Sequence, residues 1–258
     1  MKLIRELWHY REMIASLVKR DLKSRYKGSV LGFFWMFLNP LLQLAVYTIV
    51  FSTIMRMDVE NYPLFLFVAL VPWLFFSTCL SAGTTVIFSQ QDMVKKIYFP
   101  REVLPLAFTL SQFVNMLFSF IVIFVVVFLS GIKVSLAALL CLPLVWLIEF
   151  ALALGITFLV SSLNVYFRDL THILGIISMA WMYLTPIIYP LEMIPNKFVV
   201  LFYFNPMTAI TIAYRDILYN GVVPEMDTLA NAAIMAVVFL VIGRFVFSKL
   251  QRGFAEEL

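Results

Sequence analysis

The residues that usually carry chemistry are few in this chain of 258 residues, and none of them forms a recognisable catalytic or metal-binding pattern. The two histidines, His9 and His172, are far apart, and no cluster with metal-ligand spacing includes either of them. The phosphate-loop pattern GxxxxGK[ST] and the hydrolase patterns GxSxG and HExxH are absent. The sequence therefore predicts no catalytic residue, no metal and no cofactor in this chain.

Glu149 is the one candidate among the ionisable residues, because it interrupts an apolar run that is otherwise free of charge from Val134 to Phe167. An ionisable group in the middle of a membrane span costs free energy, so it is a functional candidate by default. No Lys, Arg or His is placed to pair with it. The carboxyl group is then protonated, faces water, or bonds a Ser, Thr or Asn of another span, and its role is either functional or structural.

Aromatic side chains are the second chemical resource, and they gather at three places. Rings at the membrane interface account for many such residues. The alternative is a lined pathway, because an aromatic face gives a sugar ring apolar stacking area while Tyr and Trp keep a polar group. The three places are the first apolar run (Phe33, Phe34, Trp35, Phe37), the run after 170 (Trp181, Tyr183, Tyr189) and the segment before Asn205-Pro206 (Phe202, Tyr203, Phe204).

The elements that position these residues must be transmembrane helices. Hydrophobic residues make up 63% of the chain, whereas soluble domains have roughly 45–50%. Charged residues make up 13%, which is about half the usual share. A soluble globule of this size cannot bury so much apolar surface, so a cytosolic enzyme and a nucleic-acid-binding protein are excluded. The sequence predicts an all-α integral membrane protein.

Six apolar segments are long enough to cross the membrane as helices, which takes about 20 residues for a hydrocarbon core of about 30 Å. A seventh candidate, 198–214, carries Asn205-Pro206 at its centre, where proline breaks the helix. We therefore predict a re-entrant external hairpin over 192–227, within a transmembrane domain over 28–252. The predicted spans are 31–55, 63–88, 103–130, 134–163, 170–190 and 228–250.

The basic residues indicate the orientation, because Lys and Arg favour cytoplasmic loops. With six spans, 15 of the 19 Lys and Arg residues lie on the side of both termini. A seventh span would place the basic C-terminus outside. Six spans, with both termini and a short tail (253–258) in the cytoplasm, fit the asymmetry. The four basic residues on the outer side are Arg56, Lys133, Lys197 and Arg215.

The first inner segment, 1–27, has the pattern of an amphipathic helix. Leu3, Leu7, Tyr10, Ile14 and Leu17 recur at spacings of three and four, and charged residues fall elsewhere around the helix. Such a basic helix lies in the membrane interface. It serves either as an anchor in the membrane lipid or as a surface that docks a cytoplasmic partner.

The second inner segment, the loop 89–102, has the pattern of a short helix that Pro100 ends. Its apolar residues would share one face of the helix, and its lysines would lie on another. These apolar residues are Met93, Val94, Ile97 and Tyr98, at positions i, i+1, i+4 and i+5. Such a helix suits a groove of another protein, although a solvated connector would have a similar composition. The candidate docking residues of both segments are Leu3, Leu7, Ile14, Asp92, Met93, Lys95, Lys96, Ile97 and Tyr98.

Several stretches resemble the ABC-2 type polysaccharide export permeases, which are the membrane subunits of O-antigen, capsule and teichoic-acid exporters. The opening stretch, 20–40, reads RDLKSRYKGSVLGFFWMFLNP. Residues 164–170 (NVYFRDL), 183–189 (YLTPIIY) and the Asn205-Pro206 pair also fit the family. The resemblance covers essentially the whole chain and is greatest to the O-antigen exporters.

The resemblance implies a homodimer of six-span subunits with two separate cytoplasmic ATP-binding-cassette subunits, which would hold the ATP and Mg²⁺. It implies export of a lipid-linked polysaccharide across a bacterial inner (plasma) membrane. Segments 1–27 and 90–101 would contact the ATPase, and two short gate helices would lie within 197–221. The first and fifth spans would line the substrate path with Trp35, Tyr47, Trp181 and Tyr183, and the external gate would contain Phe202, Tyr203, Asn205 and Pro206.

Three other functions stay open at this point. An ABC-2 permease could export a drug or a lipid instead of a polymer. An integral membrane enzyme acting on lipid-linked sugars could use Glu149 or Asp169 as its acid or base, although such an enzyme needs several polar residues that converge near one interface. A secondary transporter is the third, but the chain has no paired broken helices and no internal symmetry.

Overall fold

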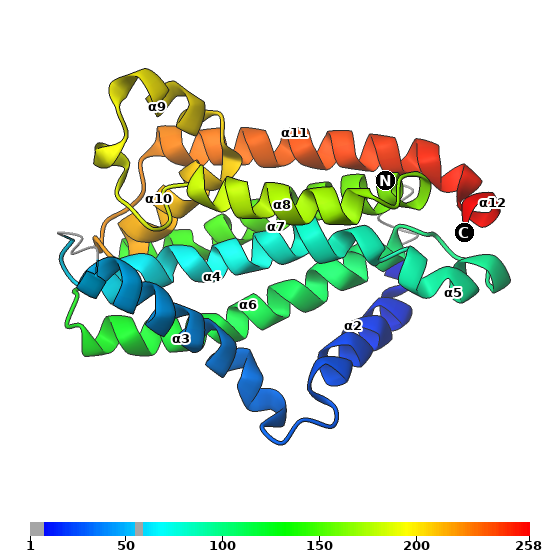
Figure 1. Ribbon diagram of the computed structural model, residues 1–258, viewed down its shortest axis with the longest axis horizontal. Helices are drawn as coiled ribbons and strands as arrows, with labels where there is room; N and C mark the ends of the chain where they lie inside the picture. Colours follow the sequence, from blue (N-terminus) through cyan, green and yellow to red (C-terminus); the bar gives the residue numbers. More distant parts are fainter. Residues whose placement is uncertain (1–7, 55–58) are drawn as a thin grey trace.

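The computed structural model describes residues 8–54 and 59–258, and every regular element in these residues is a helix. The long helices run side by side, with α5 and α12 at one end of the bundle and the α9–α10 hairpin at the other (Figure 1). The helices are α2 (Arg11–Tyr26), α3 (Trp35–Thr48), α4 (Tyr62–Ser81), α5 (Gln91–Lys96), α6 (Val103–Leu129), α7 (Leu136–Tyr166), α8 (Leu170–Tyr183), α9 (Asn196–Tyr203), α10 (Pro206–Leu218), α11 (Met226–Leu250) and α12 (Phe254–Glu257).

The helical segments have the length and composition of membrane spans. A π-helical turn, Ile49–Ile54, continues α3, and 3-10 turns follow α4. The bent pair α9 and α10 passes the same test of length and composition only together, as either a broken span or a re-entrant loop. The prediction of an all-α multi-pass membrane protein is confirmed. Five segments of the described chain are long and apolar enough to cross by themselves: Trp35–Ser52, Tyr62–Thr85, Val103–Leu129, Leu136–Tyr166 and Met226–Glu257.

The predicted fifth span, 170–190, is helical only over Leu170–Tyr183, which is 14 residues. At 1.5 Å per residue this helix is about 21 Å long, shorter than the hydrocarbon core. It ends before Pro186 because proline has no N–H to donate and disfavours helical backbone in the preceding residue. The chain then enters the hairpin, where the axes of α9 and α10 differ by 88°. Two short helices thus meet at Asn205-Pro206, as predicted.

Helix α4 forms the centre of the bundle. It packs against α3, α6, α7, α8 and α10, and its side chains from Leu64 to Val71 are buried on every side. A helix that is apolar all round must be surrounded by other helices or by lipid, and α4 is surrounded by helices. A second apolar cluster, which includes Phe247 and Phe254, joins α7, α11 and α12 to the segment 86–104 near the α5 end.

The closest helix contact uses two glycines, Gly155 of α7 and Gly243 of α11. A Cβ atom added at Gly243 would lie 1.9 Å from the carbonyl oxygen of Gly155, so the two backbones are in direct contact. Small residues permit such an approach, and close packing is a main source of helix association in lipid. The glycine pair therefore fixes the position of the last span along α7.

Helices α2 and α3 form the two arms of a V that leans against the bundle (Figure 1). The turn between them contains Gly28 and Gly32, whose φ angles are 84° and 47°. Glycine adopts positive φ without the steric cost that other residues meet, so these two positions allow the chain to reverse. The V brings the end of α2 close to the start of the first predicted span.

Part of the amphipathic helix predicted over 1–27 is present as α2, and its apolar stripe packs partly against the bundle. Tyr10, Ile14 and Leu17 pack against the second apolar cluster, and α2 lies along α6. Leu3 and Leu7 lie outside the described residues.

The predicted tail, 253–258, contains a docked helix. Phe254 of α12 is fully buried and meets Phe247 edge to face, with ring centroids 5.5 Å apart. Arg101 donates a hydrogen bond to the carbonyl of Gln251, whose side-chain amide donates to Glu102 at 2.9 Å. The C-terminus is therefore attached to the segment that follows α5.

We expect Gly243→Ala to destabilise the protein, because its methyl group would overlap the backbone of Gly155. Overpacking of this kind costs about 1–3 kcal/mol, so thermal unfolding in detergent should begin at a clearly lower temperature. Gly175→Ala in α8 is the matched control, since no described atom lies within 4 Å of a Cβ built there. Equal melting of the two variants would contradict the backbone contact.

Candidate functional site

The segment that directly follows α8 leaves helical geometry, and each carbonyl group from Tyr183 to Ile188 accepts a hydrogen bond within the protein. Non-helical backbone at membrane depth is tolerated only when protein or water satisfies it. Arg215 donates to the carbonyls of Pro186 and Ile187 at 2.5 and 2.7 Å, and Asn205 Nδ2 donates to that of Leu184 at 2.9 Å. The hydroxyl of Tyr189 donates to the Tyr183 carbonyl, and the hydroxyl of Tyr62 donates to that of Ile188 at 2.9 Å. The backbone N–H of Ile187 donates to the Thr185 carbonyl at 2.7 Å.

Arg215 has a role that the sequence analysis did not predict. It was counted among the four basic residues of the outer side, and in the structure it is only 7% exposed. Its guanidinium donates to two carbonyls of the unwound segment, and it lies 3.5 Å from the centroid of the Phe65 ring.

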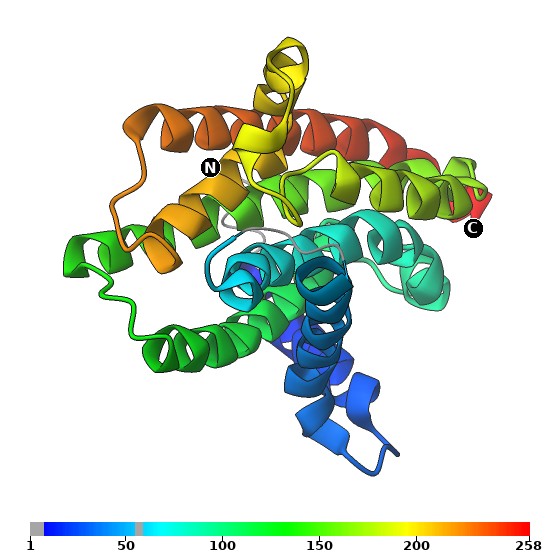
Figure 2. The same ribbon diagram turned by 60° about the vertical axis from the view of Figure 1, so that its left-hand side comes forward.

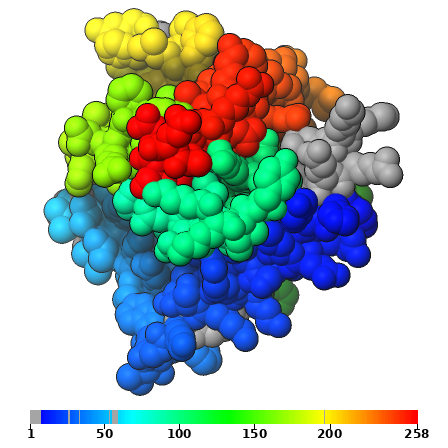
Figure 3. All heavy atoms as spheres, turned by 90° about the vertical axis from the view of Figure 1, so that its right-hand side faces the viewer, coloured from blue at the N-terminus to red at the C-terminus, as the bar shows by residue number. Residues whose placement is uncertain are grey.

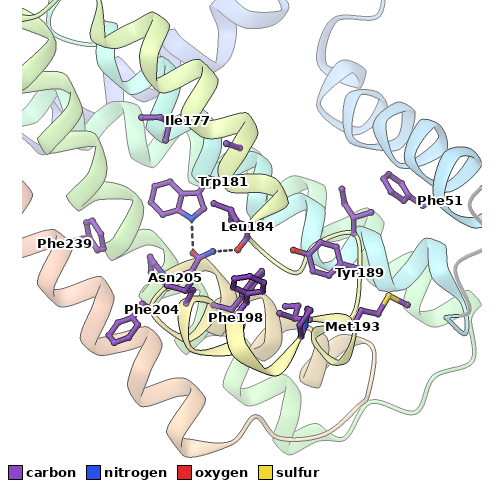
Figure 4. Close-up of a pocket in the computed structure, with 17 residues that line it drawn as sticks. Phe51, Ile177, Trp181, Leu184, Tyr189, Met193, Phe198, Phe204, Asn205 and Phe239 are labelled. Carbon is purple, nitrogen blue, oxygen red and sulfur yellow. Dashed lines mark hydrogen bonds between the residues drawn. The ribbon is translucent and has the colours of Figure 1, made fainter.

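Asn205 joins the hairpin to the end of α8 (Figure 4). Its Oδ1 accepts from the Trp181 indole N–H at 2.9 Å and from the backbone N–H of Met207 at 3.0 Å, which caps α10. Its Nδ2 donates to the Leu184 carbonyl at 2.9 Å and to Thr185 Oγ1 at 2.8 Å. Pro206 then occupies the first turn of α10, where its missing N–H has no helical role.

Glu149 is fully buried, and its Oε2 accepts a 2.5 Å hydrogen bond from the hydroxyl of Tyr214. The sequence analysis considered Ser, Thr and Asn as partners, and the partner is instead a tyrosine of α10. The other oxygen, Oε1, has no hydrogen-bond partner among the described residues. The contact ties α7 to the hairpin, which favours the structural interpretation of this carboxyl group.

An apolar pocket of about 1100 Å³ lies beneath the hairpin (Figure 4). Trp181 of the predicted substrate path lines it, together with the predicted gate residues Phe202, Asn205 and Pro206. Phe239 of α11 closes another side. The structure thus brings three of the four predicted gate residues and one path residue to a single pocket, while Tyr203 is exposed.

The other three predicted path residues lie outside this pocket. Tyr47 is half-buried, and its hydroxyl is 3.8 Å from the sulfur of Met182 in α8. Tyr183 is exposed at the end of α8. Trp35 lies at the opposite end of α3, where its indole N–H donates to Ser29 Oγ at 2.8 Å. Tyr47 and Tyr183 therefore lie near α8, whereas Trp35 belongs to a different part of the molecule.

The two gate helices are held unequally. Helix α10 is buried along most of its length and packs against α4, α7 and α11. Helix α9 stands away from the bundle (Figure 2), with Leu201 and Tyr203 exposed and Phe202 turned inward. A bond from Asn231 Nδ2 to the carbonyl of Tyr203, at 3.1 Å, links its end to α11.

At the other end of the molecule, α5, α12 and α2 share one surface (Figure 3). Tyr98 is 99% exposed there, and Ile97 is also exposed. The single apolar face predicted for the loop 89–102 is wrong, because α5 ends at Lys96 and the following backbone is extended. Val94 is therefore buried in the second apolar cluster, away from the exposed Ile97 and Tyr98. Among the predicted docking residues, Asp92, Lys95, Lys96, Ile97 and Tyr98 are exposed, while Ile14 and Met93 are half-buried.

Comparison with known proteins agrees with this architecture. The chain matches the ABC-2 type transporter family over residues 12–219. It is 35% identical over 260 residues to the O-antigen export system permease protein RfbA of Myxococcus xanthus, covering 100% of both chains. It is 31% identical over 258 residues to RfbA of Klebsiella pneumoniae, covering 100% of this chain and 99% of the relative.

A more distant relative is the polysialic acid transport protein KpsM of Escherichia coli, 23% identical over 236 residues, or 89% of this chain and 90% of the relative. The family match spans most of the helical bundle, and the first relative is similar over the full length. The chain therefore belongs to the ABC-2 type transporter family.

Proposed function

We propose that this chain is the transmembrane subunit of an ATP-driven exporter that moves a lipid-linked polysaccharide from the cytoplasmic to the outer side of a bacterial inner membrane. The full-length similarity to an O-antigen export permease, at 35% identity, is the observation that carries the proposal. The polymer would resemble an O-antigen glycan. Both termini would lie in the cytoplasm, on the same side as α5.

Two copies of the chain would work with two cytoplasmic ATPase subunits, which would hold the ATP and Mg²⁺. The surface of α5, α12 and α2 supports a docking role, because it presents an exposed aromatic ring, Tyr98, beside exposed lysines. Exposed aromatic residues are frequent anchors of protein interfaces. Closure of the ATPases would then pull on α5 and α2.

The aromatic residues of the first and fifth spans would form the substrate path. A channel must bind its polymer weakly and at many points, or the polymer would not move. Stacking on Trp181, Tyr47 and Tyr183 meets this requirement, since it adds little affinity per ring. The hairpin would act as the external gate, and its weakly held half, α9, is the part free to move.

Two alternative functions can be compared with this proposal, a permease for a drug or a lipid and an enzyme acting on lipid-linked sugars. A permease for a drug or a lipid would share the fold and the docking surface, and only the transported molecule separates it from the polysaccharide exporter. An enzyme acting on lipid-linked sugars, with Glu149 or Asp169 as its acid or base, would need several polar residues to converge near one interface. Glu149 is buried against α10, whereas Asp169 is exposed at the start of α8, which weighs against this function.

Purification from the native host should yield a soluble protein with a phosphate loop in near-equal amount. The double variant Ile97→Ser, Tyr98→Ala should reduce the recovery of this soluble protein about tenfold or more. The reason is that each anchor residue contributes about 2 kcal/mol or more to the free energy of binding at an interface. Phe128→Ala, at an exposed aromatic near the opposite end of α6, is the matched control. Unchanged recovery in the double variant would rule out this docking surface.

Asn205→Ala should block export while the ATPase still copurifies. The change removes the cap of α10, worth about 1 kcal/mol, and leaves the Leu184 carbonyl and the Trp181 N–H without partners. Surface polysaccharide, measured by immunoblot, should fall severalfold relative to Asn220→Ala, which removes a single amide on an exposed loop. Full export by Asn205→Ala would show that the hairpin needs no anchor at this position.

Glu149→Gln should retain most of the export activity, because an amide oxygen can still accept the hydrogen bond from Tyr214. Tyr214→Phe should lower the thermal stability more, since it leaves a buried carboxyl group without a donor, at a cost of about 1–3 kcal/mol. Export and melting temperature are the two measurements. A large loss of export in Glu149→Gln, with the ATPase still bound, would instead favour an enzyme or a secondary transporter.

A further inference from the structure

A cavity of about 200 Å³ lies between α3, α4 and α6, on the side where α2 and α3 form the V (Figure 1). Its walls are polar although they belong to predicted membrane spans. The polar side chains that line it are Arg25 of α2, Asn39 and Gln43 of α3, Thr78 of α4, and Gln112, Asn115 and Ser119 of α6. A polar cavity in this position is separate from the apolar pocket beneath the hairpin.

Gln112 is the strongest sign that the cavity holds a ligand. The residue is 2% exposed, and its Nε2 has no hydrogen-bond partner among the described residues. A buried amide N–H without an acceptor costs about 1–3 kcal/mol. The amide lines the cavity, so a molecule in the cavity that offers an acceptor would remove this cost.

The charge of the lining argues for a neutral ligand. Arg25 is the single charged residue among the described lining residues. Its guanidinium already pairs with the carboxylate of Asp21 at 3.0 Å, which also accepts from Ser111. The remaining polar side chains are amides and hydroxyls. The hydroxyls of Thr78 and Ser119 donate to main-chain carbonyls, so they can offer only acceptors, whereas amides carry donors and acceptors together. This combination matches a ligand with several hydroxyl groups better than it matches a phosphate.

The aromatic residue at the cavity favours a sugar ring. Trp35 lines the cavity, and the bond from its indole N–H to Ser29 holds the ring in place. An aromatic face beside amide groups provides both the stacking and the hydrogen bonds that a sugar ring uses. The cavity has room for about seven waters at ~30 Å³ each, so one ring with its hydroxyls could displace such a cluster.

We propose that this cavity binds one sugar ring of the transported glycan, with Gln112 and Asn39 bonding its hydroxyls and Trp35 stacking on its face. The inference rests on the proposed export function and adds a recognition site within each subunit. Asn39 is exposed one turn into α3, so the ring would enter from the α3 side.

Saturation-transfer NMR tests the binding directly. The protein is the permease with its copurified ATPase in lipid nanodiscs, and the probes are the monosaccharides released by acid hydrolysis of the polysaccharide that the same cells export. At least one sugar should receive saturation. Gln112→Met keeps the side-chain length without the amide and should weaken binding about fivefold, as expected for one hydrogen bond.

Asn39→Leu should have a similar effect, and Asn220→Leu, on the exposed loop after α10, should have none. If Gln112→Met fails to copurify the ATPase, Asn39→Leu takes its place, because Asn39 is the second residue proposed to bond the hydroxyls of the ring. The absence of saturation in every sugar, or equal saturation in Gln112→Met or its substitute, would mean that the cavity holds water only and would overturn the inference.

A second measurement separates the proposed export function from the proposed sugar site. Surface polysaccharide is measured in cells that lack the chromosomal gene for this chain and carry the wild-type chain or a variant on a plasmid. If the wild-type chain fails to restore export, the proposed function fails. If the wild-type chain restores export and the cavity variants show undiminished sugar binding, the proposed function stands and the recognition site alone is wrong. Reduced sugar binding together with reduced export in the Gln112 and Asn39 variants, but not in Asn220→Leu, would support both.

Discussion

The whole hairpin end depends on one constraint, which is that backbone polar groups inside a membrane must be satisfied by the protein itself. Pro186 ends α8 early and leaves a short unwound segment of free carbonyls. Arg215 satisfies two of them and Asn205 a third. A buried guanidinium is costly by itself, so the carbonyls and the arginine stabilise each other. Without the hydrogen bonds from Arg215 and Asn205, the segment would have to satisfy its own carbonyls as a helix, and the hairpin would not form.

The same bonds divide the hairpin into a fixed and a movable part. Helix α10 is attached at both ends, through Asn205 to α8 and through Tyr214 and Arg215 to α7 and α4. Helix α9 lacks comparable attachments in the described structure and leaves Leu201 and Tyr203 exposed. The 88° bend between the two helices therefore separates parts of different stability, and local opening begins where burial and hydrogen bonding are least.

The sequence was sufficient for features that depend on local composition. Apolar length predicts the spans, and Asn205-Pro206 predicts the break between α9 and α10. Features that depend on distant partners were not predictable. The sequence assigns Arg215 to the outer side but does not show that the fold brings the unwound segment to it. Residues 89–102 look like one helical face because the sequence does not show that α5 ends at Lys96, which leaves Val94 buried and Tyr98 exposed. The cavity around Gln112 requires three helices to meet.

The side-chain amides of Asn205 and Gln112 differ in how many of their hydrogen bonds are made within the protein. Asn205 makes four bonds to the protein, so its polar capacity is used and its role is to hold α8 and α10 together. Gln112 is buried more deeply, at 2% exposed, yet its amide nitrogen has no partner among the described residues. Burial of a polar group is stable only when its bonds are made, so an unmade bond facing a cavity points to a ligand. The first amide therefore belongs to the architecture, and the second belongs to what the protein binds.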